Sequence, residues 1–222
     1  MALSSIRSPR LTTKRAGPSA APRLVVARAS NPFAFLNFGN KTEQRVAAKE
    51  ELLARLDGLD RGAAATAEDK ADVERLASAL EKLNPTPQPL KAPQLLSGSW
   101  RLLYTTSDSI LATNRPALLR PRGSIYQIID VERLKARNNE TWPFFNAVTA
   151  DLTPVSANKV AVQFRTFKLF GGLISITAPD SARGELAFTY LDETLRVSRG
   201  DKGNLFLLDM DEGRRGARLE GQ

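Results

Sequence analysis

Apolar and polar side chains alternate with a period of two over much of the second half of the chain, and this alternation constrains the fold more than any other feature. Runs of this kind begin at Trp100, Ile125, Val160 and Leu186. The pattern is typical of antiparallel strands that bury one face. We expect residues 142–153 to add a further strand, so this half of the chain is predicted to be an antiparallel β-structure.

The last two hairpins allow a strand register to be predicted. A two-residue turn at residues 192–193 and a four-residue turn at residues 200–203 give the cross-strand pairs Tyr190–Leu195, Phe188–Val197, Leu186–Arg199, Val197–Phe206 and Leu195–Leu208. Every inward partner is then apolar until Arg199, which is what a specified register requires. A meander of about eight such strands closes best as an up-and-down barrel, because closure removes exposed edges. A barrel of that size is either filled by side chains or holds one small ligand.

Two amphipathic helices are predicted ahead of the strands. Thr66 with Asp69 has the spacing of a capping box, and Asn40 with Glu43 resembles one. Apolar residues then recur at helical spacing, namely Val46, Leu53 and Leu56 in the first segment and Val73, Leu76, Ala77, Leu80 and Leu83 in the second. Pro85 ends the second helix. We expect an antiparallel helical hairpin that packs on the barrel.

The N-terminal segment has the composition of an organelle-targeting peptide. Residues 1–30 are rich in arginine, serine and alanine and contain no acidic residue. They lack a long apolar core, which disfavours a secretory signal, and their hydroxyl residues favour a plastid transit peptide that is removed by about Ser30. A basic tail that binds anionic lipid is the alternative.

Charge and residue usage exclude several functions. The net charge is +8, but six basic residues lie within residues 1–30, so the remainder is near neutral and a nucleic-acid-binding face is not predicted. The chain has no cysteine and no histidine, which excludes thiol nucleophiles, imidazole bases and Cys/His metal sites. We therefore predict no metal, no cofactor and no enzyme activity. Asp192 and Glu193 are interpreted as turn residues. No apolar run approaches the roughly 18 residues needed to cross a bilayer.

The segment Gly98-Ser99-Trp100 opens the first predicted strand and resembles the lipocalin signature. In lipocalins the tryptophan closes the bottom of the barrel, and a basic side chain from the last strands covers its ring. Because the predicted register points Arg199 inward at a strand end, we predict that Gly98, Trp100 and Arg199 form the barrel closure.

Longer segments resemble the plastid-lipid-associated proteins, also called fibrillins. They are residues 56–66, 80–86, 96–107 and 184–200, within a match that runs from about residue 45 to 209. Residues 140–146 and 178–184 further suggest the small subgroup numbered as plastid-lipid-associated protein six. The resemblance implies a lipocalin-like fold in the chloroplast, at plastoglobules, thylakoids or envelope membranes. It also implies roles with lipids, prenylquinones or carotenoids and in stress protection, and it supplies no catalytic residues.

These observations lead to one main hypothesis and two alternatives. The main hypothesis is a structural or carrier protein whose barrel binds hydrophobic molecules, and the predicted cavity-lining residues are Tyr104, Ile125, Phe164, Phe188, Val197 and Phe206. The same side chains could instead simply fill the core. One alternative is an accessory subunit of a plastid lipid or prenylquinone biosynthetic enzyme, docked through the helical hairpin. The other is an isomerase or cyclase, for which Tyr104 and Tyr190 are the only inward candidates.

Peripheral membrane contact is predicted at two apolar stretches. The first contains Phe33, Phe35 and Phe38, and the second contains Phe170, Leu173 and Ile174. The predicted organisation is a transit peptide at 1–30, a linker at 31–40, a helical hairpin at 41–92, a lipocalin-like antiparallel β-barrel at 93–210 and a polar tail at 211–222.

Overall fold

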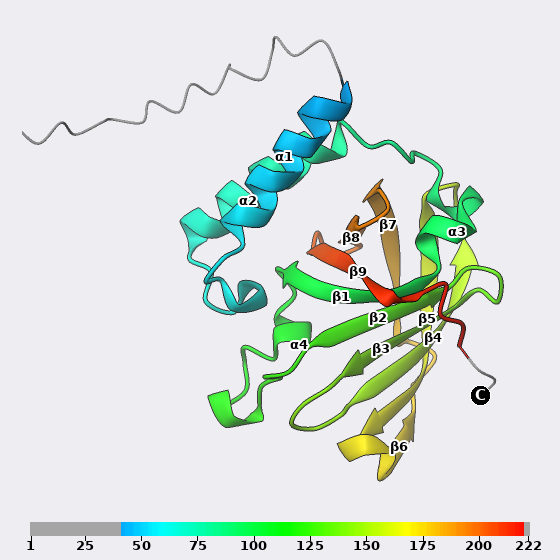
Figure 1. Ribbon diagram of the computed structural model, residues 1–222. Coiled ribbons are helices and arrows are strands. Elements are labelled where there is room, and N and C mark those ends of the chain that lie inside the picture. Colours follow the sequence, from blue (N-terminus) through cyan, green and yellow to red (C-terminus); the bar gives the residue numbers. More distant parts are fainter. Residues whose placement is uncertain (1–40, 220–222) are drawn as a thin grey trace, which may run out of the picture. The chain divides into compact units, whose positions relative to one another are not determined.

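The computed structural model describes residues 41–219. The expected transit peptide and linker, with the expected contact residues Phe33, Phe35 and Phe38, lie outside the described residues. Helices precede a β-barrel in chain order, and Figure 1 shows two of them side by side against one part of the barrel wall. The predicted fold class, a mainly β structure with an antiparallel barrel after a helical hairpin, is confirmed.

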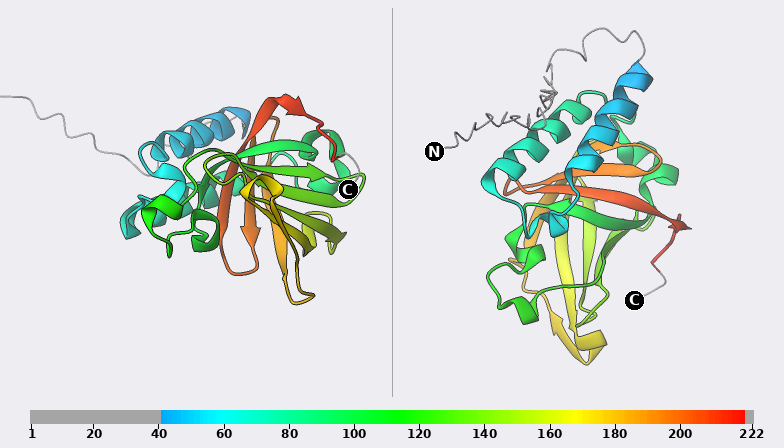
Figure 2. Two further views of the ribbon diagram at one scale, coloured as in Figure 1. Left: turned by 90° about the horizontal axis from the view of Figure 1, so that it is seen from below. Right: turned by 60° about the vertical axis from the view of Figure 1, so that its left-hand side comes forward.

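Nine antiparallel strands form one sheet, and eight of them close into a ring. The strands are β1 (Gly98–Thr105), β2 (Ile125–Asp130), β3 (Lys135–Glu140), β4 (Ala147–Pro154), β5 (Lys159–Leu169), β6 (Ile174–Thr177), β7 (Arg183–Leu191), β8 (Leu195–Gly200) and β9 (Leu205–Arg215). The β4–β5 and β1–β9 pairings complete the ring. Strand β6 pairs only with the end of β5, so this hairpin projects from the barrel (Figures 1 and 2).

The helical hairpin consists of α1 (Lys41–Arg55) and α2 (Ala67–Glu81). The predicted capping box at the start of α2 is confirmed, because the side chains of Thr66 and Asp69 each accept a hydrogen bond from the backbone N–H of the other. The short helices are α3 (Pro93–Leu96), α4 (Asp108–Leu111), η2 (Asp60–Gly62), η3 (Pro89–Lys91), η4 (Ala117–Leu119) and η5 (Phe170–Gly172). Across residues 41–219, no helix is long and apolar enough to cross a membrane.

Buried apolar side chains form two clusters on opposite faces of the barrel wall. The helix-side cluster joins the hairpin to the outer wall and contains Ala48, Leu52, Leu59, Val73, Leu76, Ala77, Leu80, Tyr104, Tyr190, Leu195, Val197, Leu205 and Leu207. The barrel core contains Leu96, Trp100, Leu102, Ile125, Ile129, Ala136, Leu152, Val160, Phe188, Leu191, Leu208 and Met210. Strands β1, β7 and β9 contribute to both clusters. Strand β8 contributes Leu195 and Val197 to the helix-side cluster and buries the polar side chains of Arg196 and Ser198 on its other face, so all four strands bury both of their faces.

The predicted register of the last two hairpins is wrong. Tyr190 lies opposite Val197, and Phe188 lies opposite Ser198, with a bulge between these two pairs. Val197 in turn lies opposite Leu207 rather than Phe206. A bulge places two residues against one and reverses the face of everything beyond it. The inward set of β8 is therefore the even-numbered residues, and Val197 faces the helices.

Three strand segments differ from the prediction for separate reasons. Strand β3 was not expected, because the sequence of residues 135–140 is polar and its inward positions, Ala136 and Asn138, are small or polar. Strand β6 was expected only as an apolar stretch between strands. Strand β9 continues to Arg215, five residues into the segment expected to be a polar tail.

Candidate functional site

A cavity of about 240 Å³ runs into the barrel. Every strand of the ring contributes to its lining, and most of the wall is apolar, with Leu152, Val162 and Leu186 as examples. The exposed side chains of Arg183 and Lys202 also line it, so the cavity opens to solvent at the barrel end where β8 leads into β9. The volume lies slightly below the range of about 300–1,000 Å³ for pockets that take drug-sized ligands. The site can therefore take a slim apolar molecule.

Four of the six predicted lining residues reach this cavity. Ile125, Phe164, Phe188 and Phe206 line it. The prediction is wrong for Tyr104 and Val197, which lie in the helix-side cluster. Tyr104 is turned outward by a bulge in the β1–β9 pairing after Leu102, and Val197 by the register described above.

Trp100 lies in the barrel core, and the arginine that covers its ring is Arg196. The Arg196 guanidinium carbon lies 4.9 Å from the centroid of the Trp100 ring and 5.6 Å from that of Phe188. Trp100 is fully buried and its indole Nε1–H donates to the carbonyl of Leu96 at 2.9 Å. The predicted Trp100–Arg199 contact is wrong, because Arg199 stands on the outward face of β8.

Arg199 instead forms ion pairs that join α2 to strand β8 of the barrel. Its Nη2 lies 2.7 Å from Glu74 Oε1, and its Nε lies 2.8 Å from Glu81 Oε1. Hydrogen bonds from Arg199 lower the pKa of the Glu74 carboxyl, and their effect is larger than the opposing effect of burial. Arg199 is therefore a structural residue of the helix–barrel contact.

Gly98 lies where the start of β1 closely approaches the end of β9. Its φ is +143°, a conformation that L-residues rarely adopt. A Cβ atom at this position would lie 3.2 Å from the Met210 side chain and 3.1 Å from the Gly216 backbone nitrogen. A larger residue would be strained at this φ and would require the Met210 side chain or the Gly216 backbone to shift by a few tenths of an ångström.

Arg196 is charged and poorly compensated inside the barrel, behind the cavity-lining residue Gln127. Its Nη2 donates to Gln127 Oε1, whereas its Nε and Nη1 have no hydrogen-bond partner within the described residues. Burial lowers the pKa of Arg196 to about 9, so the side chain keeps its charge at neutral pH. Gln127 itself lines the cavity and donates to Asn138 Oδ1 at 3.0 Å. Gln127 thus joins the cavity wall to the buried charge of Arg196 through a hydrogen bond.

Sequence reasoning missed Arg196, Gln127, Asn138 and Ser198, all of which lie on the inner face of the barrel. A polar residue at an inward position breaks the apolar alternation, so it is taken for an outward one. The signal that could have found Arg196 is its position in β8, since the odd-numbered neighbours Leu195 and Val197 are apolar enough to be buried against helices. Assigning Arg196 to the inner face of β8 requires knowing that helices cover the outer face.

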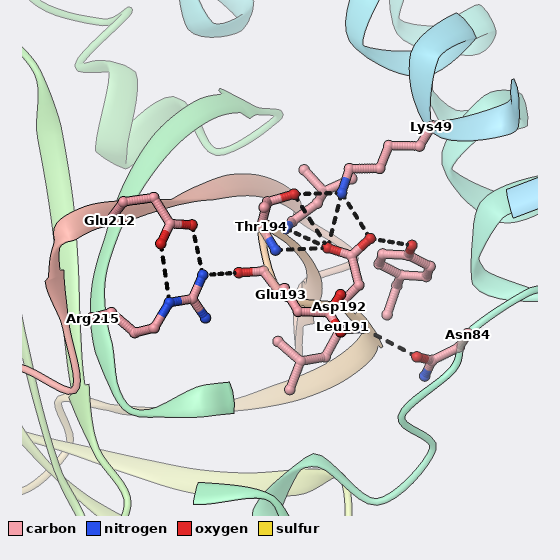
Figure 3. A network of polar contacts seen from close by, with 10 residues as sticks. Lys49, Asn84, Leu191, Asp192, Glu193, Thr194, Glu212 and Arg215 are labelled. Atoms are coloured by element: carbon pink, nitrogen blue, oxygen red, sulfur yellow. Dashed lines mark hydrogen bonds and ion pairs between the residues drawn. The ribbon is translucent and has the colours of Figure 1, made fainter. Parts of the chain in front are cut away.

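Asp192 anchors the turn between β7 and β8 to α1 (Figure 3). Its carboxylate accepts hydrogen bonds from Lys49 Nζ at 2.7 Å, from the Tyr190 hydroxyl at 2.6 Å and from the backbone N–H groups of Thr194 and Leu195. Burial alone would raise the pKa of Asp192, but these hydrogen bonds together lower it. The interpretation of Asp192 as a turn residue is confirmed, and the carboxylate is part of the helix–barrel contact.

The two tyrosines considered for catalysis lie away from the cavity. Burial raises the pKa of Tyr104, whose hydroxyl has no hydrogen-bond partner within the described residues. Burial, followed by the neighbouring Asp192 carboxylate, raises the pKa of Tyr190. Both belong to the helix-side cluster, so neither faces a molecule bound in the barrel.

The second predicted contact stretch forms the exposed tip of the β5–β6 hairpin. Phe170 is 51% exposed, Leu173 is 88% exposed and Ile174 is 46% exposed. Strand β5 passes the cavity at Phe164 and continues to Leu169. The apolar tip therefore stands at the same end of the barrel as the cavity mouth.

Comparison with known proteins identifies the family. The model of the PAP_fibrillin family matches residues 46–209. The chain belongs to this family. The match begins within α1 and ends within β9, so it covers most of the helical hairpin and of the barrel. No solved structure gives a significant match.

Three relatives carry descriptive names. Probable plastid-lipid-associated protein 5, chloroplastic, of Arabidopsis thaliana is 45% identical over 80% of this chain and 75% of its own length. Probable plastid-lipid-associated protein 3, chloroplastic, of Arabidopsis thaliana is 32% identical over 68% of this chain, which spans 54% of that relative. Chromoplast-specific carotenoid-associated protein C1, chromoplastic, of an Oncidium hybrid cultivar is 30% identical over 72% of this chain and 67% of its own length. The expected subgroup numbered six is not confirmed.

Proposed function

We propose that this fibrillin is a chloroplast protein that holds a hydrophobic molecule in its barrel at the surface of a plastoglobule or plastid membrane, as a structural or carrier module without catalysis. The molecule is a lipid, a prenylquinone or a carotenoid. The observation that carries the proposal is the open, largely apolar cavity of about 240 Å³. The plastid names of the relatives support the location, and the name of the Oncidium relative supports the ligand class.

The proposal is tested by analysing what the protein carries. The protein is recovered from plastids as it exists there, and the bound apolar molecules are extracted and quantified by mass spectrometry. Ala150→Phe places a ring in the cavity and should abolish the bound molecule, because Ala150 lines it. Ala161→Phe is the matched control, since Ala161 lies in the neighbouring strand β5 and does not line the cavity. An equal ligand content in all three proteins would contradict binding in the barrel.

Membrane contact is proposed at the tip of the β5–β6 hairpin, together with Phe33, Phe35 and Phe38. Burying each large apolar side chain of the tip in lipid contributes about 1.5–3 kcal/mol, less the cost of ordering the segment, which gives reversible binding. Because the tip lies at the mouth end, docking there would bring the cavity entrance to the lipid surface. The contact is apolar, so it should persist in high salt.

Flotation with liposomes separates the two stretches. A Phe170→Ser, Leu173→Ser, Ile174→Ser variant and a Phe33→Ser, Phe35→Ser, Phe38→Ser variant are compared with the wild type. We expect the variant with the three changes at the β5–β6 tip to lose most of its liposome binding at both low and high salt. Wild-type binding that disappears at moderate salt, with both variants behaving as the wild type does, would mean that the contact is electrostatic and lies elsewhere.

A further inference from the structure

Behind the lining residues Gln127 and Phe188, at the inner end of the cavity, the barrel buries a positive charge that no carboxylate among residues 41–219 neutralises. Arg196 has an exposed fraction of 0% and is enclosed by Trp100 and Phe188. It shares a hydrogen bond with the neutral side chain of Gln127, while Nε and Nη1 have no partner. A buried cation without a counter-ion is costly in a protein interior, where Coulomb interactions are stronger than in water. Such a charge attracts an anion that can come near it.

Two polar side chains connect this charge to the cavity. Gln127 and Ser198 both line the cavity wall, and the buried Ser198 hydroxyl has no hydrogen-bond partner within the described residues. Because Arg196 itself is fully buried, a bound molecule meets Gln127 and Ser198 first. The Ser198 hydroxyl and the amide nitrogen of Gln127 are both hydrogen-bond donors that an oxygen atom of a bound molecule can use.

The remaining wall suits an apolar chain. Arg196, Ser198 and Gly200 succeed one another on the inner face of β8, and Gly200 lies at the mouth. Four residues of strand span about 13 Å at 3.3–3.4 Å per residue. The acidic side chains that line the cavity are Glu185 and Asp201, both at the mouth, and Glu185 pairs with Lys159 at 2.6 Å. The exposed cations Arg183 and Lys202 line the mouth as well, so the mouth carries charges of both signs, whereas the inner end of the cavity lies near the uncompensated charge of Arg196.

We infer that the bound molecule is an amphiphile with one slim apolar chain and an anionic carboxylate head, and that the head lies at the inner end of the cavity against Gln127 and Ser198, in the field of Arg196. The chain then extends along the apolar wall toward the mouth. This inference rests on the proposed function, because it assigns the chemical class and the orientation of the molecule that the barrel holds.

The test compares an acid with its neutral ester. The probes are a conjugated polyene fatty acid, whose fluorescence rises in an apolar site, and the methyl ester of the same acid, each titrated into the full chain. We expect the acid to bind about tenfold more tightly than the ester, equal to about 1.4 kcal/mol. Equal affinities would overturn the carboxylate inference and leave binding in the barrel intact. Binding of neither probe would contradict the proposed function itself.

Variants assign the preference to Arg196. Arg196→Met should weaken the acid about tenfold and leave the ester unchanged, and Arg196→Lys should keep the preference. The matched control is Arg101→Met, because Arg101 is exposed on the outer wall and pairs with Asp209. If Arg196→Met does not fold, Gln127→Leu, which removes the polar contact and keeps the charge, should reduce the acid preference. Equal weakening of acid and ester in Arg196→Met would overturn the inference.

Discussion

The two halves of the barrel differ in what covers their outer face. Strands β7, β8, β9 and β1 are covered outside by the helical hairpin and inside by the barrel core. Strands β2 to β5 carry an outer face that is partly exposed and largely polar. The four strands β7, β8, β9 and β1 therefore form a covered half with two buried faces. Strands β2 to β5 form an open half with one buried face. The covered half provides the rigid wall that carries Trp100 and Arg196, whereas the open half supplies much of the apolar lining of the cavity.

Removing one leucine from the covered outer face should have the largest effect on stability. Leu207→Ala deletes a fully buried side chain beneath the hairpin and should cost about 2–5 kcal/mol of the free energy of unfolding. Ile128→Ala is the matched change on the outer face of the open half, where Ile128 is half-buried, and should cost less than about 1.5 kcal/mol. Urea denaturation followed by circular dichroism measures both. Equal costs would remove the proposed difference between the halves.

Asp192 provides a smaller, pH-dependent effect in the covered half. Asp192→Asn weakens the bond to Lys49 and should cost about 1–3 kcal/mol at neutral pH. The pKa of Asp192 is lower in the folded chain than in the unfolded chain, so its contribution is complete above the unfolded pKa of about 3.9 and is lost as pH falls through the lower folded pKa. The difference in urea midpoint between wild type and variant should therefore narrow below about pH 4. A difference that is constant from pH 7 to pH 3 would contradict the role of its charge.

The loss of an ion pair should give the smallest difference in stability cost between the covered half and the open half. Arg199→Met removes a half-buried arginine that bridges two carboxylates of α2 and should cost about 1–2 kcal/mol. Arg165→Met removes a more exposed pair with Asp151 in the open half and should cost about 0.5 kcal/mol or less. Thermal melting at low and high salt measures both. An Arg165→Met variant that is less stable than Arg199→Met would reverse the expected order.

The same difference explains what the sequence could predict. In the open half, the outer face of each strand is partly exposed to solvent. The alternation of apolar and polar residues in β5 therefore correctly places Phe164 toward the cavity. In the covered half, β8 carries Leu195 and Val197 on one face and Arg196 and Ser198 on the other. The apolar set was assigned to the interior because no local pattern reveals that helices cover the outer wall. The bulge between Phe188 and Tyr190 also has no local signature in the sequence.

The most direct test of the account asks whether a bound molecule lies beside Trp100. The chain has two tryptophans, Trp100 in the barrel core and Trp142 on the surface, so Trp142→Phe leaves a single reporter inside the barrel. Fatty acids that carry bromine at different positions along the chain quench a nearby indole. We predict saturable quenching of Trp100 that is strongest when the bromine lies close to the head group. Saturable binding of the same acids with no quenching of Trp100 at any bromine position would contradict a ligand inside the barrel.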